Sequence, residues 1–586
     1  MGSIARLFPN RKANTQDNLH LPQGHAIIEK MTVWKGCVPM SVVSSVRSFL
    51  RRVRHDGVRA IPGMVHTRWM TFIHRDVLRR EAAERRAQEA AYQAWLHAHE
   101  VPDAAPFHTD KHLSFLIPTY NTRPEHLNAL ADSLLAQSCP NWEACLYDGA
   151  SPHANTRAAL AALAERDPRF RVMLGTSNEG ISGNTNRAFV MATGDVIALC
   201  DHDDLLAPDA VRCILQAADA GADLIYTDED KVTGDGMHFY DPHVKGDFAP
   251  DSLRSGNYIC HLTALSRELM LSVGGLRSAC DGSQDHDLVL RASERARKIV
   301  HIPRILYHWR MLDTSFSHQR AASCVQAACD AVADQLQRRG MNAQVTMEEL
   351  RVRIRYAPPK GTVSAIVTGK GAVPRLPGEV IRIDNPAQAN DAARRAAGEY
   401  LLFLQAGMKP LDQAWLNELL MYAQRADVGC VGSAILDSRR FYRHAGYAVD
   451  VPGGAVSHHA GQWLYGNPYQ LTDRIVRNVT GLSAALMLVR REVFLSLGGF
   501  GAYESDLRGA DFGLRCLKAG YINVYTPHAR MVCRDEAPCL TSEAPQSDLD
   551  AFSAAWGEHP VERYYSPLFT RDGRMTIDTS PKEAAK

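Results

Sequence analysis

The chain has 586 residues, of which 45% are hydrophobic and 22% are charged. This composition is that of a globular protein and excludes an intrinsically disordered chain, and the length suggests three or four domains. The formal net charge of +1 excludes a protein whose whole surface binds polyanions. The charge is uneven, because residues 1–100 hold 16 Lys and Arg against 8 Asp and Glu, which leaves −7 for the rest of the chain.

The front of the chain, residues 1–105, is predicted to be a basic helical region. Residues 41–54 carry apolar side chains at helical spacing with four arginines between them, which predicts a short amphipathic helix. Such a helix can lie on an anionic membrane surface, or it can dock on the next domain with its arginines in solvent. The sequence leaves both open. A second helix is predicted over residues 76–99.

Three features bear on the cellular compartment. The 13 cysteines are scattered singly without a C-x-x-C pair, which favours reduced thiols over a disulfide framework or a zinc site. The longest apolar run, residues 479–489, contains Thr480, Gly481 and Ser483, and is predicted to be a buried strand because a membrane span needs about 18 apolar residues. The first residues lack the apolar core of a signal peptide. The sequence therefore predicts a cytoplasmic protein.

Strand-like and helix-like patterns alternate from residue 114 onward. Strands are predicted over residues 114–117, 143–147, 171–174 and 196–200, with helices over residues 125–136, 156–165 and 183–192. This order predicts a doubly wound, mostly parallel sheet. Such sheets bind ligands at the carboxyl ends of their strands, so we expect residues 118–121, Asp148 and residues 201–204 to lie along one edge.

The chain also repeats itself. Residues 385–419 follow the order of residues 178–211, and LVRREVFLSLGGFGA (488–502) resembles LSRELMLSVGGLRS (265–278). An Asp follows each of the latter segments, Asp285 in the first copy and Asp511 in the second. Two related domains are therefore predicted, joined by residues 313–352, largely through a helix.

Three carboxylates stand within four residues, at Asp201, Asp203 and Asp204. They repel one another, and a hard divalent cation that also bridges substrate phosphates would relieve the repulsion. The alternative is a solvated helix N-terminus, where acidic residues are common, and Asp204 can serve there. A D-x-D pattern alone does not decide between a metal site and a helix cap.

Nine short motifs surround this turn in a fixed order: IPTYN (117–121), YDGAS (147–151), NEGISGNTNRA (178–188), GDVIALCDHDD (194–204), YTDEDK (226–231), NYICHL (257–262), GGL (274–276), DGSQDHDLVLR (281–291) and HIPRILYHWR (301–310). With them, residues 114–310 resemble the family 2 glycosyltransferases, in particular bacterial enzymes that build polysaccharide or O-antigen chains. The resemblance implies an α/β fold of GT-A type, a doubly wound mixed sheet. We expect two tandem GT-A-like domains preceded by a helical N-terminal region.

These inferences predict five parts along the chain: a basic helical region (1–105), a catalytic GT-A domain (106–312), a helical connector (313–355), a second GT-A-like domain (356–545) and a C-terminal tail (546–586). In the second domain Gln405 and Gly407 stand where the first has Asp201 and Asp203. Without these carboxylates the charge of a diphosphate is uncompensated. The second domain is therefore predicted to be degenerate, binding the acceptor or stabilising the first domain; the rival hypothesis is a second active domain.

The resemblance also implies roles for single residues. The predicted catalytic base is Asp285, which is also placed as an acid at a helix N-terminus. The predicted metal ligands for Mg²⁺ or Mn²⁺ are Asp201, Asp203 and His308. The residues expected to bind the nucleotide sugar are Thr119, Tyr120, Asn121, Asp148, Asn178, Arg187, Asp201 and His202.

The predicted function is inverting transfer of a hexosyl or deoxyhexosyl group from a UDP- or dTDP-sugar to a growing cell-surface glycan, which is expected to be lipid-linked. The basic helix would provide peripheral contact with the inner face of the plasma membrane, and no nucleic acid is expected as a partner. Two alternatives remain. A nucleotidyltransferase usually has a Gly-rich basic phosphate loop, which PTYNTRPEH matches poorly. A non-catalytic glycan-binding protein would not need Asp201, Asp203 and Asp285.

Overall fold

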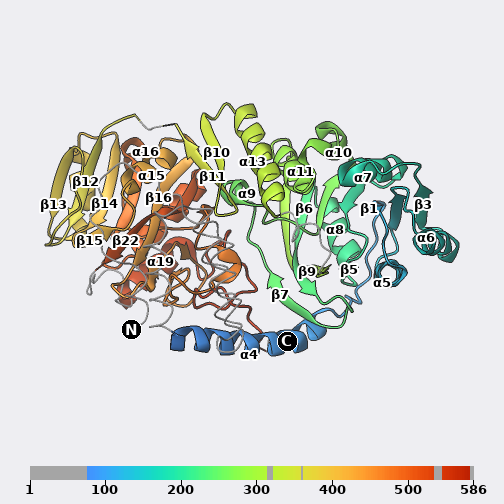
Figure 1. Ribbon diagram of the computed structural model, residues 1–586. Coiled ribbons are helices and arrows are strands. Elements are labelled where there is room, and N and C mark those ends of the chain that lie inside the picture. The colour runs from blue at the N-terminus through green and yellow to red at the C-terminus, as the bar shows by residue number, and fades with distance from the viewer. Residues whose placement is uncertain (1–74, 313–320, 358–359, 534–543, 581–586) are drawn as a thin grey trace, which may run out of the picture. The chain divides into compact units, whose positions relative to one another are not determined.

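The computed structural model describes residues 75–312, 321–357, 360–533 and 544–580, and two mixed sheets follow one another along these ranges (Figure 1). The predicted fold class is confirmed as an α/β fold with a doubly wound mixed sheet in two tandem copies. The chain divides into two compact units, residues 1–82 and 83–586, and both sheets belong to the second. The helix predicted over residues 76–99 is α4 (Arg75–His99). The amphipathic helix predicted over residues 41–54 lies outside the described residues.

The first sheet has nine strands in the order β3-β2-β1-β4-β8-β6-β9-β5, with β7 paired to β6. Strands β1 to β4 are parallel, whereas β8 runs antiparallel to both β4 and β6. Every residue of β1 and β2 is buried, as expected of strands whose two faces are both covered. The strands are β1 (Leu113–Thr119), β2 (Trp142–Asp148), β3 (Phe170–Leu174), β4 (Val196–Leu199), β5 (Leu205–Leu206), β6 (Leu224–Val232), β7 (Phe239–His243), β8 (Thr263–Ser266) and β9 (Ile299–Arg310).

Helices cover both faces of this sheet (Figure 1). On one face lie α5 (Pro124–Leu135), α6 (Ala154–Arg166) and α8 (Ala210–Asp219). On the other face lie α7 (Gly180–Met191), α10 (Arg267–Val273) and α11 (Gln284–Ser293). In α5 the buried side chains Leu127, Leu130 and Leu134 recur at helical spacing and form its stripe toward the sheet. This layering directs the carboxyl ends of β1, β2 and β4 to one open edge.

The second sheet has the order β13-β12-β14-β21-β16-β22-β15 and is reached through α13 (Ala321–Arg338) and the hairpin of β10 (Ala343–Glu348) and β11 (Arg351–Tyr356). Its strand β13 follows β12 with no helix between them in the described residues 369–378. Its strands are β12 (Val363–Thr368), β13 (Glu379–Ile383), β14 (Tyr400–Gln405), β15 (Met408–Pro410), β16 (Val428–Leu436), β21 (Leu486–Arg490) and β22 (Ile522–Cys533), with the short strands β17 (Tyr442–His444) and β20 (Arg477–Asn478) at its margins. Two further short strands, β18 (Tyr447–Ala448) and β19 (Val456–Ser457), pair with each other in a separate sheet. The helices of this part are α14 (Ala389–Arg395), α15 (Trp415–Ala423), α16 (Arg491–Ser496), α17 (Leu507–Lys518) and α19 (Gln546–Trp556).

The two sheets are repeats of one another at the level of single hydrogen bonds. In the first, Asn186 of α7 exchanges two hydrogen bonds of 2.9 Å with the backbone of Leu276, just after the Gly-Gly pair. In the second, Asn390 of α14 makes the same two bonds with the backbone of Phe500, at 2.9 and 2.8 Å. The strand registers therefore assign each residue of the first sheet an equivalent in the second. In this assignment β4 corresponds to β14, and β8 corresponds to β21.

One predicted equivalence is wrong. Asp511 forms an ion pair with Arg515, four residues on, and Arg515 also donates to the carbonyl of Leu497. In the first domain it is Asp287 that pairs with Arg291, which donates to the carbonyl of Val273. Asp511 is therefore the counterpart of Asp287, and the position of Asp285 is taken by Gly509. A Cβ at Gly509 would lie 2.2 Å from the backbone oxygen of Leu482, so the second domain has no room for a carboxylate there.

The buried strand predicted over residues 479–489 is only partly correct. The strand begins at Leu486, and residues 479–485 are buried but form no strand. Gly481 approaches the backbone of Ala510 closely, with 2.9 Å between its ideal Cβ position and that Cα, so the segment packs under α17 instead of extending the sheet. None of the helices within the described ranges is both long and apolar enough to cross a membrane.

A continuous core joins the two sheets. It begins with Tyr226 of β6 and Val289 of α11, passes through Val332 of α13 and Tyr356 of β11, and ends among the strands of the second sheet. Side chains of both sheets thus share one apolar cluster, and the second sheet is packed as part of the same compact unit as the first.

We expect Gly509→Ala to destabilise the protein, although alanine is a better helix former than glycine by about 1 kcal/mol. The added methyl group would collide with the Leu482 carbonyl, and overpacking of this kind costs about 1–3 kcal/mol, so the unfolding temperature should fall. Gly256→Ala is the matched control, because no atom lies within 4 Å of its Cβ position and its φ is 171°. A thermal melt in which both variants behave alike would contradict the close packing of Gly509 against the Leu482 carbonyl.

Candidate active site at the carboxyl edge of the first sheet

The acidic turn lies between β4 and β5 and is fixed from β9, the strand that pairs with β5. Asp204 is fully buried and accepts hydrogen bonds of 2.6 Å from the Tyr307 hydroxyl and from the backbone N–H of Arg310. The Arg310 guanidinium donates to the backbone carbonyl of Asp203, whose carboxylate lies 3.6 Å from Nδ1 of His202. The turn is thus held rigidly, with the side chains of Asp201 and Asp203 partly exposed.

The structure brings His261 to this turn, a residue to which sequence reasoning gave no role. Ala198 of β4 pairs with Ala264 of the antiparallel strand β8, so the residue three before Ala264 lies opposite the residue three after Ala198. Nε2 of His261 lies 3.9 Å from Oδ2 of Asp201, and its ring stacks on Tyr307 with 4.8 Å between ring centroids. Ligand atoms of Asp201, Asp204 and His261 all lie within 4.8 Å of one another.

The electrostatics of this cluster favour a cation. Burial and the charges of Asp203 and Asp285 raise the pKa of Asp201, while His261 acts in the opposite direction. Burial and the charges of Asp203 and Asp201 raise the pKa of Asp204 well above its usual range. Two carboxylates and an imidazole that converge at this spacing are suitable ligands for Mg²⁺ or, with the nitrogen donor, Mn²⁺. The residues present therefore fit a divalent metal.

The prediction that His308 is a metal ligand disagrees with its contacts. Its Nδ1 lies 2.6 Å from Oδ1 of Asp230 and its Nε2 lies 2.8 Å from Oε1 of Glu100, so both ring nitrogens already face carboxylates. Burial disfavours the imidazolium, but the charge and hydrogen bond of Asp230, with Glu100, outweigh burial and raise the pKa of His308 to about 10. A protonated imidazole has no lone pair for a metal, so in this arrangement His308 stabilises the strands beneath the site.

Asp285 stands in the first turn of α11 and faces the same edge. Its Oδ2 accepts a hydrogen bond of 2.7 Å from the side-chain amide of Asn257, which belongs to the loop that also carries His261. The charge of Asp285 is close enough to raise the pKa of Asp201. The predicted base and the acidic turn are therefore brought together, although 84 residues separate them in the sequence.

The predicted nucleotide-binding residues after β1 and β2 form a tight polar network. Asp148 is fully buried, and its carboxylate accepts from the Ser151 backbone N–H at 2.8 Å and from the hydroxyls of Ser151 and Thr119. Asn121 has a φ of +53° and donates from its backbone to the Ser151 hydroxyl at 2.8 Å, while Oδ1 of its side chain is buried without a partner in the described residues. Tyr120 is exposed.

The two predicted residues around α7 differ in their surroundings. Oδ1 of Asn178 accepts hydrogen bonds of 3.0 Å from the Gly180 backbone and the Asn184 side chain, so it shapes the loop before the helix. Arg187 is exposed and pairs at 2.8 Å with Glu179, the residue that directly precedes α7. The structure does not bring the Arg187 guanidinium into a contact with the acidic turn.

The second sheet keeps the strands of this edge without its charged side chains. The registers place Gln405 opposite Ala485, where the first sheet has Asp201 opposite His261. They also place Leu436 beside Val532, where the first sheet has Asp230 beside His308. Four further acidic residues of the first sheet have uncharged counterparts at the equivalent positions of the second. Asp203 corresponds to Gly407, Asp204 to Met408, Glu229 to Ile435 and Asp285 to Gly509.

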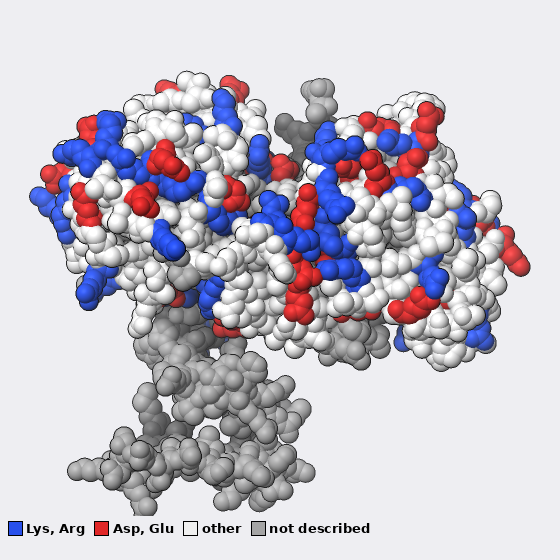
Figure 2. Space-filling model, turned by 90° about the horizontal axis from the view of Figure 1, so that it is seen from above, with Lys and Arg blue, Asp and Glu red and all other residues white. Residues whose placement is uncertain are grey.

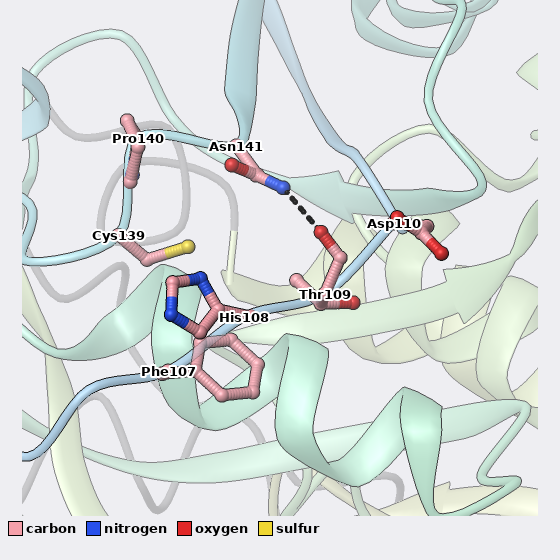
Figure 3. Close-up of a pocket in the computed structure, with 7 residues that line it drawn as sticks. All are labelled: Phe107, His108, Thr109, Asp110, Cys139, Pro140 and Asn141. Atoms are coloured by element: carbon pink, nitrogen blue, oxygen red, sulfur yellow. Dashed lines mark hydrogen bonds between the residues drawn. The ribbon is translucent and has the colours of Figure 1, made fainter.

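A surface hollow of about 530 Å³ lies at the opposite end of the strands (Figure 3). It is formed by the segments that precede β1 and β2, and the side-chain amide of Asn141 donates to the carbonyl of Thr109 across it. The other residues that line it are Phe107, His108, Asp110, Cys139 and Pro140. Because it precedes the strands, this hollow is separate from the carboxyl edge that carries the acidic turn.

Comparison with known proteins gives a family for part of the chain. Residues 114–265 match the family described as Glycosyl transferase family 2. The matched range runs from β1 to β8, and it includes the acidic turn and His261 but ends before Asp285.

Two relatives extend the similarity beyond that range. The chain is 30% identical over 539 residues to the uncharacterized protein y4gI of Sinorhizobium fredii, covering 80% of this chain and 59% of that protein. It is 32% identical over 516 residues to the O-antigen biosynthesis protein RfbC of Myxococcus xanthus, covering 78% of this chain and 40% of that protein. Each alignment covers more than three quarters of this chain, and the chain spans less than two thirds of the length of either relative.

Solved structures resemble parts of the chain at low identity. S. aureus TarS 1-349 in complex with UDP-GlcNAc is 15% identical with a TM-score of 0.33, covering 38% of this chain and 66% of that chain. Mannosyltransferase PcManGT from Pyrobaculum calidifontis, in complex with GDP-Man and Mn²⁺, is 19% identical with a TM-score of 0.32, covering 44% of this chain and 74% of that chain.

We expect His308→Gln to lower the free energy of unfolding by about 3–5 kcal/mol below pH 6.5, because it leaves the buried Asp230 and the partly buried Glu100 without a counter-ion. The pKa of His308 is raised from 6.5 to about 10 on folding, so its contribution is complete below pH 6.5 and is lost as the pH rises toward 10. The difference between wild type and variant, measured by chemical unfolding, should shrink over that interval. The exposed His238→Gln is the control, and a pH-independent difference would refute the assignment.

Proposed function

We propose, from the match of residues 114–265 to glycosyl transferase family 2, that the chain transfers a sugar from a nucleoside diphosphate donor to a growing glycan. The observation that carries the proposal is the convergence of Asp201, Asp204 and His261 with Asp285 at one edge of the first sheet. The family match accounts for the acidic turn, and the contact of Asp285 with Asn257 brings a proton acceptor to the same place.

The proposed chemistry is a single displacement with inversion at the anomeric carbon. One oxygen of the Asp285 carboxylate is held by Asn257, which orients the other toward the acceptor. That carboxylate takes the proton of the acceptor hydroxyl as its oxygen attacks the anomeric carbon, and the bond from that carbon to the diphosphate breaks.

The proposed metal ligands are Asp201, Asp204 and His261, with Asp203 as the further predicted ligand. A bound Mg²⁺ or Mn²⁺ would neutralise the charge that develops on the departing nucleoside diphosphate. Tyr307 and the Arg310 backbone hold Asp204 in place, so the ligand positions are set before the donor binds. Tyr307 also stacks on the His261 ring and so orients the imidazole.

The proposed nucleotide site follows β1 and β2. Thr119 and Ser151 hold the Asp148 carboxylate, whose oxygens can accept a hydrogen bond from the imide N–H of a uracil or thymine base, which favours a UDP- or dTDP-sugar. The unpartnered Oδ1 of Asn121 is a second acceptor at this edge. Tyr120, Asn178, Arg187 and His202 remain predicted contacts of the donor.

The second sheet is proposed to be non-catalytic. Gln405, Gly407 and Gly509 replace the acids of the first sheet, so this edge lacks the carboxylates proposed to hold a cation in the first sheet. The division of the chain at residues 105, 312, 355 and 545 remains part of this proposal. The likeness to an O-antigen biosynthesis protein supports a cell-surface polysaccharide as the product. A lipid-linked acceptor at the cytoplasmic face of the membrane would suit the basic residues of the front end.

A donor screen tests the proposed function directly. The full-length protein is incubated with UDP-, dTDP- and GDP-sugars, with and without Mn²⁺, and the released nucleoside diphosphate is measured. Release from a UDP- or dTDP-sugar that depends on Mn²⁺ is the expected result. If no donor is turned over and neither UDP nor dTDP binds in the presence of Mn²⁺, the glycosyltransferase proposal is refuted.

We expect Asp285→Asn to lower the transfer rate by about 10²–10⁴-fold, since it removes the proton acceptor while the amide keeps the size of the side chain. Binding of UDP with Mn²⁺, measured by calorimetry, should persist because the ligands of the acidic turn are unchanged. The exposed Asp330→Asn is the matched control and should transfer normally. Full transfer activity in Asp285→Asn would remove Asp285 from the proposed role.

A further inference from the structure

Two buried charged residues, Lys245 and Glu229, bind the backbone of His261 from two sides. We propose that this pair positions the His261 imidazole at the acidic turn and thereby sets the affinity of the site for a divalent cation. The inference rests on the proposed function, because it gives Lys245 and Glu229 a part in the same metal site. Both would be positioning residues, since neither is a ligand itself.

The side-chain ammonium group of Lys245 donates hydrogen bonds to three backbone carbonyls. Its side chain is fully buried, and Nζ donates to the carbonyl oxygens of His261 at 2.7 Å, Ile259 at 2.6 Å and Thr227 at 2.7 Å. An ammonium group has three N–H bonds, so all of them are used. Two carbonyls of the histidine loop thus converge on one cation, which ties the loop to Thr227 of β6.

Glu229 binds the same residue from its N–H side. Its Oε2 accepts the backbone N–H of His261 at 2.7 Å and lies 3.6 Å from Nζ of Lys245, while its Oε1 lies 2.9 Å from Nδ1 of His243. Hydrogen bonds to charged groups are shorter and stronger than neutral ones. The N–H and the C=O of His261 are therefore each held by a buried charge of the appropriate sign.

Lys245 and Glu229 together form a clamp on the loop around Cys260 and His261, and this loop has an unfavourable backbone conformation. Cys260, between the two carbonyls bound by Lys245, has a φ of +41°, which is disfavoured for a residue with a Cβ atom. Such conformations persist where surrounding contacts over-determine them. With the backbone fixed in this way, the His261 ring stacks on Tyr307 and presents Nε2 at 3.9 Å from Asp201.

The second sheet indicates that the clamp serves the site and not the fold. The strand registers match Glu229 to Ile435 and His261 to Ala485, and Gly446, two residues after His444, takes the place of Lys245. The lysine, the glutamate and the histidine are thus absent together, although the strand order is retained. Burying two opposite charges is costly, and a sheet of this topology forms without them.

The test measures metal binding in the full-length protein. Mn²⁺ is titrated and free Mn²⁺ is followed by electron paramagnetic resonance, for wild type and Lys245→Met. Loss of a group that orients a metal ligand typically weakens binding by about 10–100-fold, and that is the expected result. Lys298→Met is the matched control, because Nζ of the exposed Lys298 also donates to a backbone carbonyl, that of Ala220, and its Mn²⁺ affinity should be unchanged.

A double-mutant cycle separates positioning from a general loss of structure. In a His261→Ala background, Lys245→Met should weaken Mn²⁺ binding no further, because the ring to be positioned is gone. Glu229→Gln, which keeps an acceptor oxygen but removes the charge, should weaken binding about tenfold, and it carries the test if circular dichroism finds Lys245→Met unfolded.

Two results would overturn the inference: a folded Glu229→Gln or Lys245→Met with wild-type affinity, or equal weakening with and without His261. Wild-type protein that binds no Mn²⁺ would refute the proposed metal site itself, and the clamp with it. Normal wild-type binding with unchanged variants would refute the clamp alone and leave the proposed function in place.

Discussion

The antiparallel placement of β8 between β4 and β6 is the constraint on which the site depends. In an all-parallel sheet the carboxyl edge collects only residues that follow strands, such as Asp148 and Asp201. Because β8 runs the other way, the residues before it reach the same edge. The loop that carries Asn257 and His261 is thereby brought to the acidic turn, and it links that turn to Asp285.

Around this loop the structure buries charges that a stable core does not require. Three acids in succession on β6, Asp228, Glu229 and Asp230, are buried, and each faces a histidine: His301 at 2.8 Å, His243 at 2.9 Å and His308 at 2.6 Å. Desolvation makes such groups expensive unless they are paired, and every one of them is. At the matching positions of β16 stand Ala434, Ile435 and Leu436, so the same fold forms with an apolar strand.

On the surface, in contrast, Figure 2 shows that charged side chains of both signs are spread over the visible face.

The sequence predicted local structure well and long-range contacts poorly, for physical reasons. Periodicity located β1, β2 and α13, and the motif order located the acidic turn. His261 was missed because its place depends on the direction in which β8 pairs, which no local pattern encodes. The D-x-D pattern favoured Asp203, whereas burial and the hydrogen bonds from Tyr307 and Arg310 bring Asp204 to the cluster.

Two other predictions from local patterns also differ from the contacts in the structure. His308 was predicted as a metal ligand from its motif, but its partners Asp230 and Glu100 come from β6 and from the segment after α4, far from it in sequence. Asp511 was matched to Asp285 by spacing after the Gly-Gly pair, and only the contacts of Arg515 and Arg291 distinguish it as the counterpart of Asp287. Spacing in the sequence matched Asp511 to a residue two positions from its counterpart, whereas the hydrogen bonds shared by the two domains identify the equivalent residue directly.

The second sheet supports the site through packing. Between Lys245 and Asn257 the chain forms α9 (Pro250–Ser255), whose Asp251 is buried and is bound by Arg425 and by Asn478 of β20. Arg254 of the same helix is bound by Gln335 of α13. The segment between the clamp lysine and the asparagine that orients Asp285 is thus fixed by residues of the connector and the second sheet. This packing contribution depends on hydrogen bonds and a continuous core, and it needs no acidic turn in the second sheet.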